Sequence, residues 1–284
     1  EELIRVSKAG ADYLLSIKDE TYHILENLDS YPVLIPTDSN MPNFYKLIDR
    51  AVQDKLTFIA DPILDPISYG FTKSIERYIY LREKYPDIHI MIGIGNITEL
   101  THADTSGMNM IMLGIVEELK LNHILTTQVS RHCSTVIRET DLARRIIHAA
   151  SENNITPKHI NNGLLINHGH KDYAYTSDEL SDMKSNIKDK NYRIYVNDDG
   201  VHLFNKTIYK VFSDPYDFYE FLEVDEDSGH SFYLGVELAR AQIAYQLRKE
   251  YSQDEELDWG CLIDKKADNK LQSKELGPTF KKRK

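Results

Sequence analysis

The chain has 284 residues, 41% of them hydrophobic and 28% charged, an ordinary composition for a globular protein. Its formal net charge of −11 argues against a nucleic-acid-binding surface, so we expect no nucleic-acid partner. No apolar stretch reaches membrane-spanning length and no signal peptide opens the sequence, so we expect no membrane partner and a cytoplasmic location. The two cysteines, Cys133 and Cys261, lie far apart and make no disulfide framework.

The first half of the chain alternates short apolar runs with amphipathic segments. The expected strands, with their polar loops, are residues 11–17, 32–38, 57–66, 89–97 and 123–128. Helices are expected around residues 75–82, before Pro86, and over residues 107–120 and 135–150. Strand, helix and strand in this order predict a parallel α/β sheet.

Five strands are too few to close an eight-stranded (β/α) barrel. The sheet is therefore open, or the first strands belong to sequence upstream of Glu1. We expect the second case, in which residues 1–152 hold barrel strands four to eight. A segment with two unpaired sheet edges is then expected to be insoluble or molten on its own.

Polar residues follow the third and fourth expected strands, where barrels place their chemistry. Asp61 ends one strand, and its carboxylate could accept paired hydrogen bonds from a heterocycle or could cap a turn. Gly93 and Gly95 allow close approach of a ligand, and Asn96 offers a donor and an acceptor. The glycines alone do not make a dinucleotide fingerprint.

The alternation of strand and helix patterns ends after Ser151, and residues 153–157 predict a domain boundary. Residues 158–262 are expected to form a small α+β domain, with a hairpin centred on Asp199-Gly200 and a helix over residues 230–251. Its expected role is docking or homo-oligomer formation, or simple stabilisation of the barrel. Residues 263–284 predict a disordered basic tail.

Histidine and cysteine residues invite metal and nucleophile hypotheses, which we weigh against simpler ones. His168 and His170 lack a cysteine or carboxylate cluster at ligand spacing, so no metal site is expected. Arg131 follows the fifth strand, in a loop that could touch a ligand. Cys133 has no identifiable base partner and is expected to be inert.

Five segments resemble the pterin-binding barrel superfamily: residues 61–66, 93–100, 106–109, 126–130 and 136–145. This superfamily includes dihydropteroate synthases and tetrahydropterin-dependent methyltransferases. Within it, the chain is most similar to the archaeal-type dihydropteroate synthase-related proteins, associated with making tetrahydromethanopterin-type cofactors. Residues 233–241, 253–254 and 257–260 resemble the C-terminal module of unknown function of that family.

The resemblance implies a TIM-barrel portion followed by a small α+β domain, with a pterin as ligand or substrate. Asp61 falls on the aspartate that holds the pterin, with Asn96, Gly93, Gly95 and Ser16 beside it. Gln128, Arg131 and Asp38 are candidate contacts for a substrate or phosphate, and Mg²⁺ could accompany a pyrophosphate.

The implied activity is condensation of a dihydropterin-methyl pyrophosphate with an arylamine. Gly95-Asn96-Ile97 stands where synthases carry a Ser-Arg-Lys signature, and it is closer to the Ser-Asn-Val of the methyltransferases. Methyl transfer from a tetrahydropterin is therefore the competing enzyme hypothesis. A non-catalytic pterin-binding scaffold is the third hypothesis, because both basic residues are missing.

Overall fold

The computed structural model describes residues 1–37, 41–224 and 227–264. The chain divides into two compact units, Glu1–Leu164 and Leu165–Lys284, which are described separately. Of the described helices, none is both long and apolar enough to cross a membrane. The expected basic tail falls almost wholly on residues 265–284, outside the described part of the chain.

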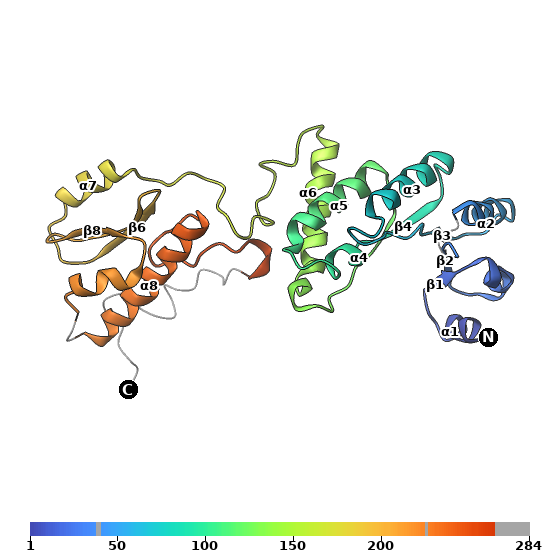
Figure 1. Ribbon diagram of the computed structural model, residues 1–284, viewed down its shortest axis with the longest axis horizontal. Coiled ribbons are helices and arrows are strands. Elements are labelled where there is room, and N and C mark those ends of the chain that lie inside the picture. Colours follow the sequence, from blue (N-terminus) through green and yellow to red (C-terminus); the bar gives the residue numbers. More distant parts are fainter. Residues whose placement is uncertain (38–40, 225–226, 265–284) are drawn as a thin grey trace. The chain divides into compact units, whose positions relative to one another are not determined.

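Unit 1 is built on a five-stranded parallel sheet whose strands follow one another in chain order (Figure 1). The strands are β1 (Tyr13–Ile17), β2 (Tyr31–Leu34), β3 (Ile59–Ala60), β4 (His89–Gly93) and β5 (His123–Leu125). The helical segments are α1 (Glu2–Lys8), η1 (Asp19–Asn27), α2 (Met41–Gln53), α3 (Phe71–Lys84), α4 (Gly95–Thr98), α5 (Thr105–Glu118), η2 (Arg131–Cys133) and α6 (Val136–Glu152). The predicted mixed α/β class and parallel sheet are thus confirmed.

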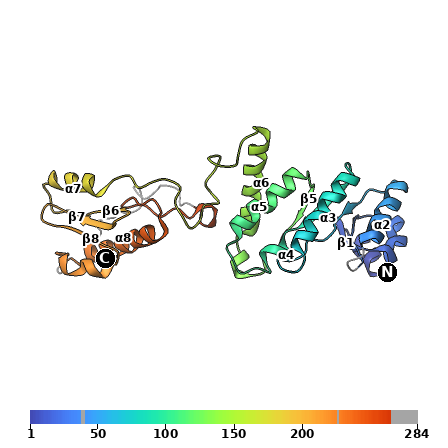
Figure 2. The same ribbon diagram turned by 45° about the horizontal axis from the view of Figure 1, so that its top comes forward.

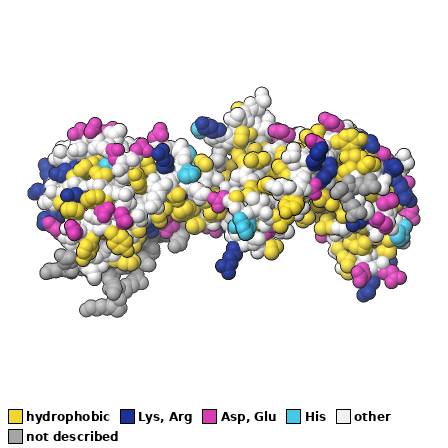
Figure 3. All heavy atoms as spheres, viewed as in Figure 1, with side chains coloured by type: hydrophobic (Ala, Val, Ile, Leu, Met, Phe, Trp, Pro, Cys, Tyr) yellow, Lys and Arg dark blue, Asp and Glu magenta, His cyan; other side chains and the backbone are white. Residues whose placement is uncertain are grey.

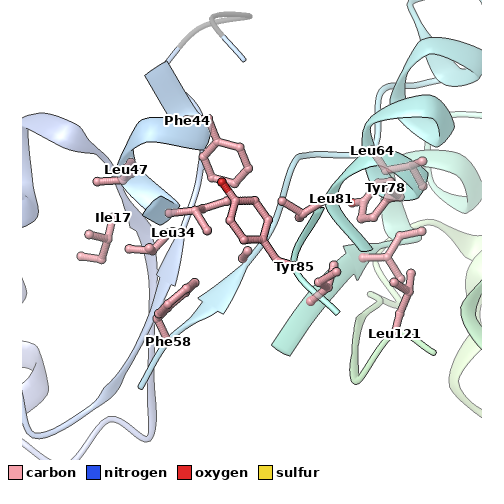
Figure 4. Packing of buried hydrophobic residues seen from close by; sticks show 14 of the residues in the cluster. Ile17, Leu34, Phe44, Leu47, Phe58, Leu64, Tyr78, Leu81, Tyr85 and Leu121 are labelled. Carbon is pink, nitrogen blue, oxygen red and sulfur yellow. The ribbon is translucent and has the colours of Figure 1, made fainter. Parts of the chain in front are cut away.

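The two faces of this sheet carry different side chains because successive residues of a strand point to opposite sides. One face, with Leu34, Ala60 and Ile92, joins the main core, to which the helices contribute residues such as Phe44 and Tyr78. Figure 4 shows part of this core. The other face holds a second, smaller cluster: Val33, Ile59 and Met91, with Ile35 packed against it.

The sheet is curled into a half-barrel. Its inner face is the one that carries Tyr13, Tyr31 and His123, and the short distances between aromatic rings on this face show the curvature. The ring centroids of Tyr13, on β1, and His123, on β5, are 6.1 Å apart although three strands separate them in the sheet order. His89 Nδ1 lies 3.0 Å from His123 Nε2 on the neighbouring strand. Tyr13, Leu15 and Tyr31 remain 50%, 43% and 52% exposed, so this face is only partly covered within unit 1.

Arg82, close to the end of α3, fastens this helix to the segments before β4 and β5. Its guanidinium donates five hydrogen bonds of 2.6–3.2 Å to oxygen atoms of Pro86, Ile88, Leu119, Lys120 and Asn122. A planar group with a fork of donors can satisfy several carbonyl groups at once, which an ammonium cannot. Arg82 therefore holds the turn after α3 and the turn after α5 together.

We expect Arg82→Lys to lower the free energy of unfolding by about 2 kcal/mol, because several backbone carbonyls lose a charged donor. Urea denaturation followed by circular dichroism measures this loss. Arg144→Lys is the matched control, since the Arg144 guanidinium bonds Asp141 on an exposed helix surface. Its expected cost is within about 0.5 kcal/mol. Equal unfolding midpoints for the two variants would contradict the role given to Arg82.

Unit 2 contains a separate antiparallel sheet in the order β6 (Arg193–Asn197), β7 (Gly200–Phe204) and β8 (Tyr209–Phe212). Its helical segments are α7 (Ser177–Ser185), η3 (Pro215–Phe221), α8 (Ser228–Leu247) and η4 (Gly260–Leu262). Helix α8 packs on β6 and β7, beside which it lies in Figures 1 and 2. Ile194 and Leu203 of the sheet meet Leu234 and Leu238 of α8 in the core of this unit.

The hairpin and the long helix of unit 2 are found where they were expected, with shifted ends. The turn is Asp198-Asp199, because Asn197 pairs with Gly200. Asn197 Oδ1 accepts a hydrogen bond of 2.9 Å from the Asp199 amide, which fixes the turn one residue before the predicted Asp199-Gly200. The helix ends at Leu247, since Arg248 adopts a left-handed conformation with φ 51°.

Candidate functional site

The loops after β3, β4 and β5 lie at the carboxyl ends of neighbouring parallel strands. Asp61 follows β3 directly, and its amide donates to Leu34 O at 2.9 Å, so it continues the strand pairing. It lies two residues after Ile59, which places its side chain on the inner face of the half-barrel. The candidate site is therefore built around Asp61.

The Asp61 carboxylate uses one oxygen within the protein and leaves the other open. Oδ1 accepts hydrogen bonds from the Ile63 amide at 2.8 Å and from the Tyr78 hydroxyl at 3.0 Å. Oδ2 accepts none from the residues that the structure describes. Burial raises the pKa of Asp61 above its ordinary value, although these two hydrogen bonds and the charge of Arg77 oppose the rise.

Tyr78 anchors the Asp61 carboxylate from α3. It is fully buried, and its hydroxyl donates to Asp61 Oδ1 at 3.0 Å. Burial and the neighbouring Asp61 charge raise the pKa of Tyr78 well above its usual range. The phenol therefore keeps its proton and acts as a donor to Asp61. Figure 4 shows Tyr78 beside Leu64 of the loop after β3.

The loop after β3 has a strained backbone at Ile63, whose φ is 63°. This left-handed conformation is unfavourable for a β-branched side chain and persists only where surrounding contacts enforce it. Arg77 supplies one such contact, because its Nη2 donates to Ile63 O at 2.5 Å and to Asp65 Oδ2 at 2.8 Å. Arg77 Nε is buried and has no hydrogen-bond partner among the described residues.

Asn96 meets the same loop from the first turn after β4. Its Nδ2 donates to Leu64 O at 2.7 Å, and its side chain is otherwise exposed. Asn96 thus braces the Asp61 loop and keeps its carbonyl oxygen for another partner. Around Gly93 there is open space, since a Cβ atom there would meet nothing within 4 Å. At Gly95 a Cβ atom would come within 3.2 Å of Thr127 Oγ1.

Glu99 ties the loop after β5 to the α4 region. Its carboxylate accepts hydrogen bonds from the Thr127 hydroxyl at 3.0 Å and from the amides of Val129 and Ser130, each at 2.8 Å. The backbone hydrogen bond from Val129, with those from Ser130, lowers the pKa of Glu99 to about 2. Glu99 is therefore ionised at neutral pH and fixes the position of residues 127–130.

Of the remaining predicted site residues, Gln128 and Arg131 lie after β5 and Ser16 lies within β1, and none of the three has a hydrogen bond to Asp61. Gln128 is exposed, and its Nε2 donates to Ser134 O at 2.8 Å, within its own loop. Arg131 is exposed at the start of η2. Ser16 is exposed with φ 69°, where the pairing of β1 with β2 is irregular. Asp38 lies outside the described residues.

Three residues of this site are not singled out by the sequence reading: Tyr78, Arg77 and Glu99. Tyr78 lies within the helix that the sequence predicts around residues 75–82, on its buried side. A buried tyrosine also needs a partner for its hydroxyl, which is the signal that could have linked it to Asp61. Arg77 and Glu99 carry no comparable signal, because their partners are fixed by the fold.

The histidine and cysteine candidates serve other roles where the structure describes them. His168 Nδ1 lies 3.0 Å from Leu247 O. No group of three His, Cys, Asp or Glu side chains is arranged to hold a metal ion in the described parts of the chain. Burial raises the pKa of the Cys133 thiol to about 11, which disfavours a nucleophilic thiolate at neutral pH.

No model of a known protein family matches the chain. The chain is similar to a protein of Methanocaldococcus jannaschii named uncharacterized protein MJ0107, with 29% identity over 302 residues. The match covers 90% of this chain and 56% of that protein. The chain thus spans about half the length of the curated relative it matches.

The raised pKa of Asp61 predicts a dependence of stability on pH. The folded state holds this proton more tightly than the unfolded state, where the value is near the ordinary 3.8. Relative to Asp61→Asn, wild-type stability should therefore fall as pH rises from about 4 through the raised pKa, and stay level above it. Thermal unfolding of both proteins across this range measures the trend. A difference in stability that does not vary with pH would contradict it.

Proposed function

We propose that the half-barrel of this chain binds a reduced pterin, with Asp61 contacting the amino-pyrimidinone edge. The observation that carries the proposal is the state of Asp61 Oδ2, which accepts no hydrogen bond from the described residues although the rest of the carboxylate is fixed. A pterin edge presents adjacent N–H donors, and an ionised carboxylate is the acceptor that matches them.

The surroundings of Asp61 support a planar heterocyclic ligand. Gly93 leaves open space at the end of the neighbouring strand, so a flat ring can approach the backbone. Asn96 lies in α4, directly after β4, and its Oδ1 is available to a ligand while its Nδ2 donates to Leu64 O. The contacts of Tyr78 and Arg77 hold Asp61 and its loop in place before any ligand arrives.

We expect Asp61→Asn to weaken binding of 7,8-dihydropterin by about 30-fold to 1,000-fold, since the variant places an amide donor or a weaker acceptor against the ring donors. Isothermal titration calorimetry of the full chain measures the dissociation constants. Asp12→Asn is the matched control, because Asp12 is an exposed carboxylate before the amino end of β1. Equal affinities of wild type and Asp61→Asn would refute the assignment.

The reaction that we propose for the whole protein is condensation of a dihydropterin-methyl pyrophosphate with an arylamine. The amine nitrogen forms a bond to the pterin methylene carbon, the bond from that carbon to the pyrophosphate oxygen breaks, and the nitrogen gives up one proton to solvent. Charge on the departing pyrophosphate needs a cation. Arg131, exposed in the loop after β5, is the candidate in this chain, and Mg²⁺ bound to the pyrophosphate would add to it.

Methyl transfer from a tetrahydropterin is the second candidate, and the asparagine at position 96 favours it. Its free carbonyl oxygen could accept a hydrogen bond from a pterin ring nitrogen, and no basic residue stands in Gly95-Asn96-Ile97.

The two reactions give different products, so we expect pyrophosphate release with a dihydropterin-methyl pyrophosphate and 4-aminobenzoate, and no methyl transfer. A coupled phosphate assay measures the first signal. Consumption of methyl-tetrahydropterin in the presence of a thiol or corrinoid acceptor measures the second. Methyl transfer alone would replace the condensation hypothesis. Neither signal, with pterin still bound in calorimetry, would favour the non-catalytic scaffold.

A further inference from the structure

Two histidines on the inner face of the half-barrel meet nitrogen to nitrogen. His89 is the first residue of β4, and His123 is the first residue of β5. His89 Nδ1 lies 3.0 Å from His123 Nε2, and the ring centroids are 5.2 Å apart. At this distance one nitrogen carries a hydrogen atom and the other accepts it. The two neutral rings therefore form one hydrogen bond.

This contact can accept one added proton but not two. A first proton binds the far nitrogen of the donating ring, and the hydrogen bond then becomes charge-assisted. A second proton has to bind the accepting nitrogen itself, because the far nitrogen of that ring already carries a hydrogen atom. Two N–H groups and two positive charges then face each other. The doubly protonated pair cannot keep the 3.0 Å contact.

The surroundings of the pair oppose the second proton. Burial, followed by the charge of His89, lowers the pKa of His123, and no carboxylate among the described residues acts against this. The other titratable side chains on the inner face are Tyr13 on β1, Tyr31 on β2 and Asp61 on β3. Tyrosine side chains are neutral at and below neutral pH. Asp61 is two strands away from His123, with β4 between them.

Two more carboxylates lie near the amino ends of the strands. Asp12 precedes β1, Asp87 lies two residues before β4, and both are exposed. Neither is among the groups that shift the pKa of His123. The charge that opposes protonation of His123 is therefore that of His89.

The backbone beneath the pair is fixed, so repulsion acts on the side chains. The Asn122 amide donates to Ile90 O at 3.1 Å, and the Ile90 amide donates to Asn122 Oδ1 at 3.2 Å. Arg82 adds hydrogen bonds to Ile88 O at 3.0 Å and to Asn122 Oδ1 at 3.2 Å. These bonds keep the starts of β4 and β5 together. A repelled imidazole must therefore turn about its own side-chain bonds.

His123 also contacts the first strand of the sheet. Its ring stands edge-on to the ring of Tyr13, with centroids 6.1 Å apart and an interplanar angle of 66°. Tyr13 and His89 are exposed, so the rings have room to turn. Rotation of His123 away from His89 changes its position against Tyr13, and the contact between β1 and β5 is then lost.

We propose that His89 and His123 form a pH-sensitive latch on the inner face of the half-barrel, which holds Tyr13 against β5 at neutral pH and releases it when both imidazoles are protonated. The strand pairing stays in place, because its hydrogen bonds do not involve the imidazoles. Acid pH therefore separates the first strand from the last on this face without unfolding the sheet. The latch operates whether or not the half-barrel binds a pterin.

NMR spectra of the full chain with labelled histidine and tyrosine, recorded from about pH 8 to about pH 4.5, test the latch. We expect a nuclear Overhauser effect between the Tyr13 and His123 rings at neutral pH and its loss below about pH 6, with the amide signals of β4 and β5 unchanged. Persistence of the effect at the lowest pH would refute the latch. Its loss only together with the amide signals would show general unfolding and would also refute it.

The variant His89→Gln separates the latch from an ordinary histidine titration. Glutamine can still hydrogen-bond His123 but stays uncharged. We therefore expect His123 to take up its proton at higher pH than in wild type, and its contact with Tyr13 to persist at about pH 4.5. Release at the same pH in both proteins would refute the latch, because the charge of His89 would then play no part.

The matched control is His23→Gln, which removes an exposed histidine of η1 whose Nδ1 lies 3.1 Å from Glu20 O. It should release Tyr13 at the same pH as wild type. The chain has 11 histidines, and histidine side chains are exposed on the face drawn in Figure 3. The His123 signals are therefore assigned from the spectrum of His123→Gln. A shift in His23→Gln as large as that in His89→Gln would show a general charge effect and would refute the latch.

Discussion

The half-buried carboxylate of Asp61 is the constraint around which the site of unit 1 is organised. A carboxyl group buried at the end of β3 must replace lost hydration with hydrogen bonds, and it does so with the Ile63 amide and the Tyr78 hydroxyl. These contacts fix the loop after β3 against α3. Asn96, which follows β4, donates to Leu64 O at 2.7 Å, so the end of β4 is held against the same loop.

The sequence predicts the scaffold of unit 1 better than its site. Apolar runs bounded by polar loops identify all five strands, because burial of alternating side chains is a local property of the sequence. Asp61 and Asn96 are also visible, since each follows such a run. Tyr78 donates to Asp61 across 17 positions, and Glu99 bonds Val129 and Ser130 across 30 and 31, so the chain order gives no sign of these contacts.

In unit 2, too, the sequence predicts the secondary structure but not the side-chain contacts that fix its details. The Tyr- and Val-rich segment with its Asp-Gly pair predicts a hairpin, and one is present. The position of the turn depends on Asn197, whose side chain bonds the Asp199 amide and places Gly200 in β7. The outer edge of β6 is capped by Gln253, which bonds the Ile194 amide and Tyr192 O from 59 and 61 positions further along the chain. Neither feature follows from propensity alone, because both depend on side-chain contacts with the backbone.

The left-handed backbone at Ile63 indicates that loop geometry, and not stability alone, determines the residue at this position. A sequence optimised for stability alone would carry glycine or asparagine at this position, since either adopts a left-handed backbone at less cost. Isoleucine, with its branched side chain, instead limits the number of conformations open to the folded loop. The position therefore trades thermodynamic stability for a narrow range of loop geometries, and engineering that restores stability there would widen the range.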